Sequence, residues 1–180
     1  MIKQMPFDEL NTFKVDLTQN PQAEREEEDI IDEILDLAIL SYLNGVNDAN
    51  DMLGTNETAD VDKMREAIYR EYDGRDFAAD VKRHFAENSA SGIALVADTT
   101  SHRAYVMGEL DAAKSGGVAQ TKTWDTMLDD KVRDTHEYLQ SETIPIDADF
   151  YTYTGAKAQA PGLFGIPEED CNCRCWLTFF

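Results

Sequence analysis

Histidine and cysteine side chains in the last third of the chain are the strongest candidates for chemistry. Cys173 and Cys175 are separated by a single residue, and His136 precedes them. An imidazole nitrogen and two thiolates are three ligands of the kind that zinc prefers, although the spacing Cys-x-Cys is tighter than is usual for paired zinc cysteines. The fourth ligand has three candidates: Cys171, Asp129 and His102. A structural zinc is therefore one interpretation of these residues.

The same side chains allow two other interpretations. In a thiol enzyme, His136 would activate Cys173 or Cys175 while Asp129 orients the imidazole. A metal-dependent hydrolase built on His136, Cys173 and Cys175 is the other enzymatic interpretation. In a packed core, His136 would form hydrogen bonds in the interior, Asp129 would pair with Arg133 or Arg174, and the cysteines would be small buried side chains. Because cysteine is so often merely buried, we prefer the packed core.

The charge balance limits the classes of partner. Thirty-six acidic against 16 basic residues give a formal net charge of -20 and a pI near 4.3. Such a surface repels phosphate backbones, so direct nucleic-acid binding is disfavoured and protein partners are expected. An acidic protein that mimics nucleic acid is a further alternative. No apolar run has membrane-spanning length, and three cysteines without an export signal do not predict a disulfide framework.

Apolar residues recur at helical spacing through the first two thirds of the chain. They predict helices over residues 22–52 and, capped by Thr58, over residues 59–72, with a turn at Asp73-Gly74. One long helix is predicted from Asp76 to the pair Gly116-Gly117, and Gly92 and Gly108 within it indicate either a break or close helix packing. Residues 1–20 are predicted to form a loosely docked arm, whose apolar residues are Phe7, Leu10 and Phe13.

The spacing of the apolar residues is no longer helical after Gly117. Residues 118–124 and 171–180 have strand character, residues 144–146 suggest an edge strand, and residues 149–166 suggest an ordered loop. A short helix over about 129–139, capped by Thr126, would place Asp129, Arg133 and His136 on one face. An extended segment from Cys171 to Cys175 would likewise place all three thiols on one face.

The fold class predicted from these elements is α+β, with N-terminal helices, one of them long, followed by a small antiparallel sheet module with a short helix. We expect an arm over 1–20, a helical region over 21–117 and a C-terminal α+β module over 118–180, packed with the helices as one unit.

A series of motif residues runs in order from the long helix to the cysteines: Thr99, Arg103, Gly108, Gly117-Val118, Trp124, Asp129, Arg133, His136, Phe150, Pro161-Gly162 and Asn172 to Cys175. This series resembles the phage Mu F-like head morphogenesis family, also called minor head or minor capsid proteins of tailed bacteriophages. Two positions depart from the family pattern. Thr100 stands where the family often has Glu, and Ser141 where it usually has the Gly of a tight turn, which leaves the geometry after His136 open.

The resemblance implies a non-enzymatic phage or prophage protein that acts in head morphogenesis. Members associate with the portal inside the procapsid in few copies and assist assembly or DNA entry, which places them in the host cytoplasm during assembly and then in the virion head interior. The residues expected to hold the module together are Trp124, Asp129, Arg133, His136, Phe150, Asn172 and Arg174. The acidic helices would offer the surface for the portal or other head proteins.

Overall fold

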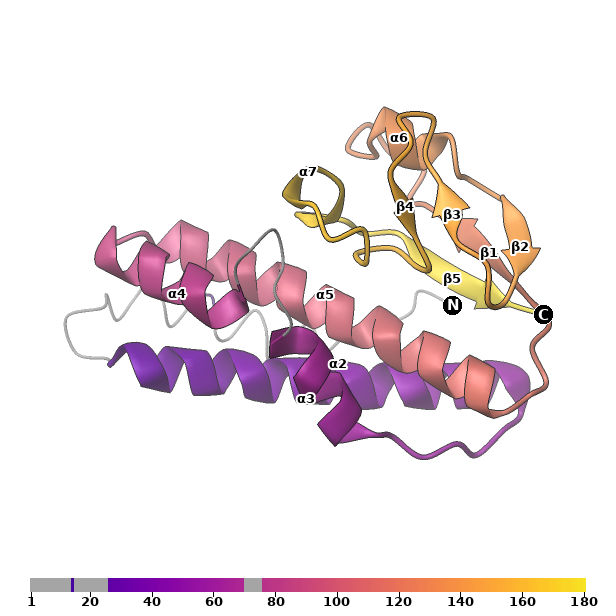
Figure 1. Ribbon diagram of the computed structural model, residues 1–180, viewed down its shortest axis with the longest axis horizontal. Coiled ribbons are helices and arrows are strands. Elements are labelled where there is room, and N and C mark those ends of the chain that lie inside the picture. Colours follow the sequence, from indigo (N-terminus) through magenta and orange to yellow (C-terminus); the bar gives the residue numbers. More distant parts are fainter. Residues whose placement is uncertain (1–13, 15–25, 70–75) are drawn as a thin grey trace.

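Helices and a small sheet form two parts of one molecule in the computed structural model, which describes Lys14, residues 26–69 and residues 76–180. The helices lie together, and the sheet module packs on one side of the two longest helices (Figure 1). This confirms the predicted α+β class. Apart from Lys14, the predicted arm with Phe7, Leu10 and Phe13 lies outside the described residues, as do the turn at Asp73-Gly74 and Tyr72 of the second predicted helix.

Two long helices, α2 (Glu27–Leu53) and α5 (Ala90–Ser115), run side by side in the same direction (Figure 1). Aliphatic side chains fill the space between them, among them Ile30, Ile34, Ile93 and Ala97, each with no exposed surface. Helix α2 ends where Gly54 adopts a left-handed conformation (φ 67°), which glycine enters without steric cost. The helical pair is the frame on which the rest of the chain packs.

Helices α2 and α5 approach each other closely at two glycines, Gly45 on α2 and Gly108 on α5. A Cβ atom on Gly45 would lie 2.0 Å from the carbonyl oxygen of Tyr105, and one on Gly108 would lie 2.2 Å from that of Tyr42. No side chain fits at these distances, so the two backbones are in direct contact. Gly108 therefore marks close helix packing, which is one of the two meanings that its position in the sequence suggested.

The single long helix predicted from Asp76 onward is wrong, because the chain forms two helices there, α4 (Phe77–Ala86) and α5. Asn88 has a left-handed conformation (φ 53°), and Ser89 caps α5 by accepting a hydrogen bond from the Gly92 amide at 3.2 Å. The apolar pattern continues through the break because both helices bury a face against the same core.

The second predicted helix is shorter than expected. It is α3 (Val61–Tyr69), which buries Met64 and Ile68. Asp60, rather than Thr58, satisfies its first turn, since the Asp60 carboxylate accepts a hydrogen bond from the Lys63 amide at 3.0 Å.

A three-stranded antiparallel sheet organises the C-terminal part. Its order is β2 (Thr143–Pro145), β1 (Thr121–Asp125) and β5 (Trp176–Phe179), so β1 is the central strand and the predicted edge strand is confirmed. The strands β3 (Phe150–Tyr151) and β4 (Lys157–Ala158) form a separate hairpin within the segment predicted as a loop. The last strand begins at Trp176, later than predicted.

The predicted helix over 129–139 is also wrong in length, because only α6 (Asp134–Glu137) forms. Leu128 has a positive φ of 53°, and Arg133 is extended (φ -69°, ψ 148°), so the preceding residues cannot continue the helix. Asp129 and Arg133 therefore do not share a helix face with His136. A further short helix, α7 (Pro167–Asp170), precedes the cysteines.

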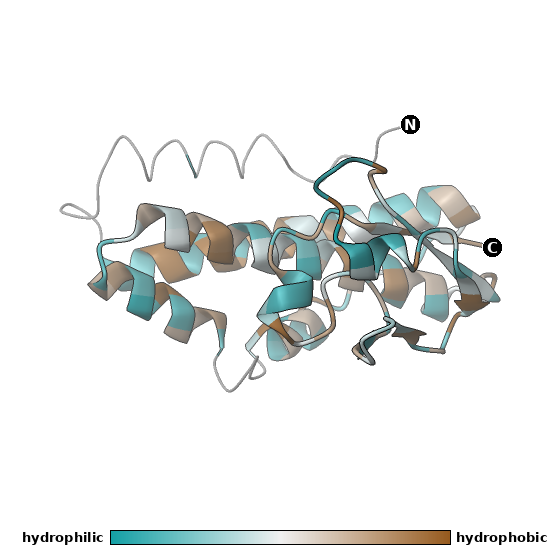
Figure 2. Cartoon of the chain, turned by 90° about the horizontal axis from the view of Figure 1, so that it is seen from above, coloured by the Kyte–Doolittle hydropathy of each residue, from teal (hydrophilic) through white to brown (hydrophobic). Residues whose placement is uncertain are grey.

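The distribution of hydropathy fits this arrangement. Brown, hydrophobic residues alternate with teal ones along the helices in Figure 2, as expected where one face of each helix is buried. No helix in the described part of the chain is long and apolar enough to cross a bilayer.

Lys122 is an unusual member of the sheet core. It lies on β1 opposite Ile144 of β2 and Phe179 of β5, and its side chain is fully buried. Its ammonium group lies 5.6 Å from the centre of the Phe150 ring, and no hydrogen-bond acceptor reaches it among the described residues. Burial lowers the pKa of Lys122 to about 8, and the positive charge of Lys114 acts in the same direction.

Replacing Gly108 by Ala should lower the free energy of unfolding by about 2 kcal/mol or more, because the new methyl group would have to displace the Tyr42 carbonyl. Helix propensity alone would act the other way by about 1 kcal/mol, so the sign of the change tests the contact. Urea unfolding followed by circular dichroism measures it. Asn47→Ala, at an exposed position of α2, is the control and should be neutral or slightly stabilising. Equal gains in both variants would contradict the contact.

Lys122→Met should raise the free energy of unfolding at pH 7 by about 2 kcal/mol, because it removes a buried charge. Above pH 8 Lys122 loses its proton in the folded parent chain, whereas in the unfolded chain it keeps the proton up to its ordinary pKa of 10.5. The free energy of unfolding of the parent therefore rises with pH in this range. The advantage of the variant should therefore shrink from pH 8 to pH 10 in unfolding curves. Lys131→Met, at an exposed lysine, should show no such trend; a constant difference for Lys122→Met would contradict the buried charge.

Candidate functional site

Trp124 is the centre of the module. It sits on the central strand with no exposed surface, and three rings meet it edge-on. The ring centres of His136 and Phe150 both lie 5.2 Å from that of Trp124, and that of Phe164 lies 5.8 Å away. Edge-to-face contacts at these distances are favourable for aromatic pairs. The predicted motif residues Trp124, His136 and Phe150 are thus brought together in one aromatic cluster.

The His136 ring is almost completely enclosed, with 1% of its surface exposed. It projects from α6 and stacks on Phe164, with ring centres 5.6 Å apart and planes inclined by 17°. Its Nδ1 atom lies 3.6 Å from Cys173 Sγ and 3.5 Å from Cys175 Sγ. One ring nitrogen therefore faces both thiols at nearly equal distance.

Glu169 faces the other ring nitrogen and was missed in the sequence. Its Oε2 atom lies 3.1 Å from His136 Nε2, close enough for an ion pair but without the alignment of a hydrogen bond. The Thr135 hydroxyl donates a hydrogen bond of 2.7 Å to the same oxygen. Glu169 lies in α7, whose start is marked by Pro167 in the first turn, and carboxylates are common at such a position. The buried carboxylate thus lies behind the imidazole, on the side away from the thiols.

The two thiols influence each other's pKa through a side-chain hydrogen bond. The S–H of Cys173 donates to Cys175, and with burial this raises the pKa of Cys173 to about 12. The same hydrogen bond lowers the pKa of Cys175. Both side chains are buried, with 6% and 4% of their surfaces exposed, so no open approach to a substrate leads to either sulfur.

Cys171 does not join the other two cysteines, so the prediction that the three thiols share one face is wrong. Asn172 between them is left-handed (φ 56°), and the Cys173 amide donates to the Asp170 carbonyl at 3.2 Å. This turn sends Cys171 to a cavity between α4 and α5 that Thr99 and Arg103 also line.

Asp129 and Arg174 form the predicted charge pair. The guanidinium donates two hydrogen bonds to the carboxylate, of 2.8 and 2.6 Å. The pair lowers the pKa of Asp129 and raises that of Arg174. Because both side chains are partly exposed, the pair contributes little free energy, and its effect is to fix the loop before α6 against the loop before β5.

Arg133 and Asp170 hold the surrounding loops through backbone contacts. The Arg133 guanidinium donates to the Cys171 carbonyl. The Asp170 carboxylate, which is buried, accepts from the Phe164 amide at 3.1 Å and from the Gly165 amide at 2.8 Å. Asp170 was also missed in the sequence, where it appeared only as one of several acidic residues in a row.

The proposed fourth ligands lie apart from the cluster. The group of potential metal donors in the described part of the chain contains only His136, Cys173 and Cys175, whose ligand atoms all lie within 4.8 Å of one another. His102 is buried nearby but directs Nε2 to the Cys175 carbonyl at 2.9 Å, and Asp129 is held by Arg174. These three donors are the residues that would hold a metal.

The structure shows how the chain accommodates Ser141, one of the two departures from the family pattern. Ser141 has a left-handed conformation (φ 63°), which is the conformation that a glycine would supply there, and its amide donates to the Trp124 carbonyl at 2.8 Å. Thr100 is buried on α5. The turn after α6 therefore has the backbone geometry of a glycine turn without the glycine.

Nearly all of the C-terminal module lies within a segment of the chain that is similar to known proteins. Residues 61–178 match the model of a family described as Phage Mu protein F like protein. The chain is 34% identical over 87 residues to Minor head protein GP7 of Bacillus phage SPP1. The aligned segment covers 47% of this chain and 28% of GP7. No solved structure matches.

A second relative is an enzyme. The chain is 37% identical over 65 residues to NAD(+)--arginine ADP-ribosyltransferase EFV of Enterococcus faecalis, covering 36% of this chain and 13% of that protein. The chain thus spans only 28% and 13% of the lengths of these two relatives. The family match covers most of the chain, including every residue of the aromatic cluster and the cysteine pair. The resemblance seen in the sequence is confirmed, and the chain belongs to the family of Phage Mu protein F-like proteins.

Proposed function

We propose that the chain acts in head morphogenesis as a minor head protein, associated with the portal inside the procapsid, where it assists assembly or DNA entry. The observation that carries the proposal is the inward direction of the motif's aromatic residues and histidine. Trp124, His136 and Phe150 are buried against one another, so the family's pattern maintains a module rather than lining an open site. The similarity to a minor head protein of phage SPP1 supports the same role.

An enzyme built on His136, Cys173 and Cys175 is the weaker alternative. A nucleophilic thiolate has to reach its substrate, and both sulfurs lie in an enclosed cluster. The ADP-ribosyltransferase shares a segment equal to 13% of its own length, which is too little to carry its activity to this chain.

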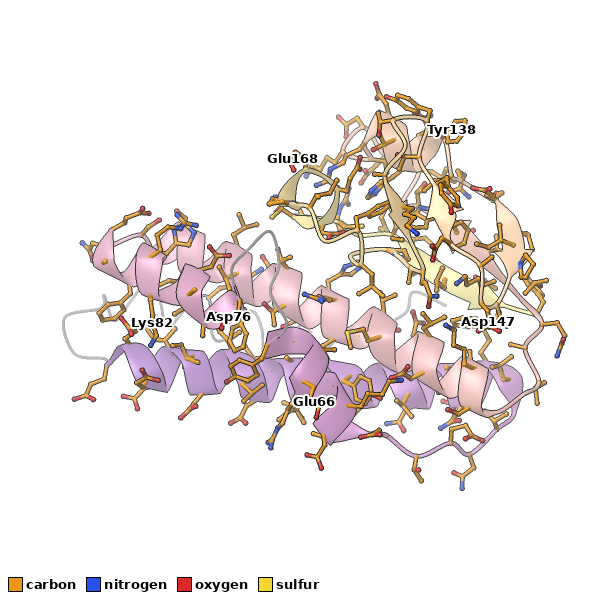
Figure 3. The ribbon with its side chains drawn as sticks, viewed as in Figure 1. Glu66, Asp76, Lys82, Tyr138, Asp147 and Glu168 are labelled. Carbon is orange, nitrogen blue, oxygen red and sulfur yellow. The ribbon has the colours of Figure 1, made fainter. Side chains whose placement is uncertain are left out.

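Within residues 26–69 and 76–180, the acidic residues do not form one continuous face of the kind that a nucleic-acid mimic requires. Exposed carboxylates lie on α2, α3 and the sheet module alike. Figure 3 labels Glu66 on α3, Glu168 on α7 and Asp147 beside the sheet, and these side chains point to different sides of the molecule.

We propose that α2 supplies the partner surface. Asp29, Asp32 and Asp36 follow one another at helical spacing, and all three side chains are exposed. A row of carboxylates on a rigid helix attracts a basic surface over a range of about 8 Å at physiological salt, which would steer association with a head protein.

Changing Asp29, Asp32 and Asp36 together to Asn should weaken binding to the portal ring of the same phage about tenfold at low salt, because electrostatic attraction is lost. The formal charge changes from -20 to -17. Analytical ultracentrifugation of the full chain with purified portal measures the affinity, and the difference should disappear at high salt.

The matched control changes the same charge on the sheet module through three other exposed carboxylates: Asp130, Glu137 and Glu142. This variant should bind the portal within about twofold of the parent. An equal loss of portal affinity in both variants would show that net charge alone determines binding, and would contradict a specific binding surface on α2. Failure of the parent chain to bind the portal, together with its absence from procapsids by mass spectrometry, would contradict the portal association itself.

A further inference from the structure

Three soft donors meet at one buried point although they come from two separate parts of the chain. His136 lies on α6, whereas Cys173 and Cys175 lie on the segment that leads into β5. Their ligand atoms lie within 4.8 Å of one another, and all three residues are buried. A packed core of this size would be made more simply from apolar side chains, so the choice of nitrogen and sulfur requires an explanation.

The distances match those around a tetrahedral zinc ion. With Zn–S of about 2.3 Å and Zn–N of about 2.0 to 2.1 Å, a nitrogen and a sulfur ligand are separated by about 3.6 Å. His136 Nδ1 lies 3.6 Å from Cys173 Sγ and 3.5 Å from Cys175 Sγ. Both nitrogen–sulfur edges of the tetrahedron are therefore already present.

A hydrogen bond explains only one of these two contacts well. An imidazole nitrogen either donates one N–H or accepts along one lone pair, so it cannot serve two sulfurs equally. A cation between the nitrogen and both sulfurs serves all three donors at once.

Glu169 provides a second, independent observation. Histidines that bind metals usually have a carboxylate or carbonyl behind the ring, which fixes the tautomer and raises the basicity of the ligating nitrogen. Glu169 Oε2 lies 3.1 Å from Nε2, the nitrogen that faces away from the thiols, and Thr135 holds that oxygen in turn. The ring is thus oriented with Nδ1 toward the sulfurs.

We propose that His136 Nδ1, Cys173 Sγ and Cys175 Sγ bind one zinc ion, with Glu169 orienting the imidazole. The ion would join α6 to the segment before β5 and so close the module around Trp124. This assignment is independent of the head morphogenesis role, because it concerns how the module is held together.

The full chain, expressed in zinc-supplemented medium and purified without chelators, should contain about one zinc per molecule by elemental analysis. Cobalt added to the metal-free chain should give thiolate-to-metal charge-transfer absorption together with the d–d bands of a tetrahedral ion. The cobalt spectrum uses the unaltered chain, so it stays decisive even if a variant fails to fold. Folded chain with neither zinc nor the cobalt bands would overturn the proposal and leave a hydrogen-bonded cluster.

Cys173→Ser and Cys171→Ser form a matched pair, since both remove a thiol from the same short segment but only Cys173 lies in the donor group. Cys173→Ser should lose zinc, and its thermal midpoint should fall to that of the chelator-treated parent. Cys171→Ser should keep its zinc. Loss of zinc in Cys171→Ser alone would overturn the donor assignment.

Glu169→Gln tests the carboxylate behind the ring. The variant should keep one zinc at saturation but bind it about 10- to 100-fold more weakly in competition with a chelating dye. Thr135→Val, which removes the hydroxyl that holds Glu169, should weaken binding in the same direction by a smaller factor. Unchanged affinity in Glu169→Gln would overturn the positioning role of Glu169.

Discussion

The C-terminal module depends on enclosing one imidazole ring. Burying a polar ring costs free energy unless its nitrogens meet polar groups. A carboxylate oxygen lies 3.1 Å from one nitrogen of His136, and two thiols face the other. The ring stacks on Phe164 and meets Trp124 in an edge-to-face contact. Because these partners come from β1, the loop before α7, α7 and the segment before β5, the position of one side chain fixes four segments relative to one another. The aromatic contacts and the loop hydrogen bonds then follow from this arrangement.

The pair of helices α2 and α5 is held together in a different way from the C-terminal module. At Gly45 and Gly108 the absence of side chains allows backbone contact, whereas the module needs particular side chains at particular places. A helix pair of this kind forms an apolar frame with little chemical specificity, and the specificity of the family pattern lies in the module. Membership of the Mu F-like family agrees with a motif whose aromatic residues and histidine face inward.

Helical periodicity predicted the existence and type of most elements, and the ordered motif predicted the family. Periodicity could not reveal the break at Asn88, because α4 and α5 bury their faces in one core and the apolar pattern is continuous. The residues themselves carry a local signal, since Asn favours the left-handed conformation and Ser favours a helix cap. Leu128 offers no such signal, so the shortness of α6 depends on tertiary contacts that sequence patterns do not record. Glu169 was missed for a related reason: three adjacent acidic residues look alike until folding buries two of them.

The order of pairing in the sheet has a consequence for synthesis on the ribosome. The central strand β1 pairs with β5, which is made more than fifty residues later, and the thiols that face His136 come just before that last strand. The helical pair can form as soon as α5 has emerged, whereas the module keeps its aromatic residues exposed until β5 is available. Folding of the two parts is therefore separated in time, and the aromatic cluster around Trp124 can close only after the last strand is made.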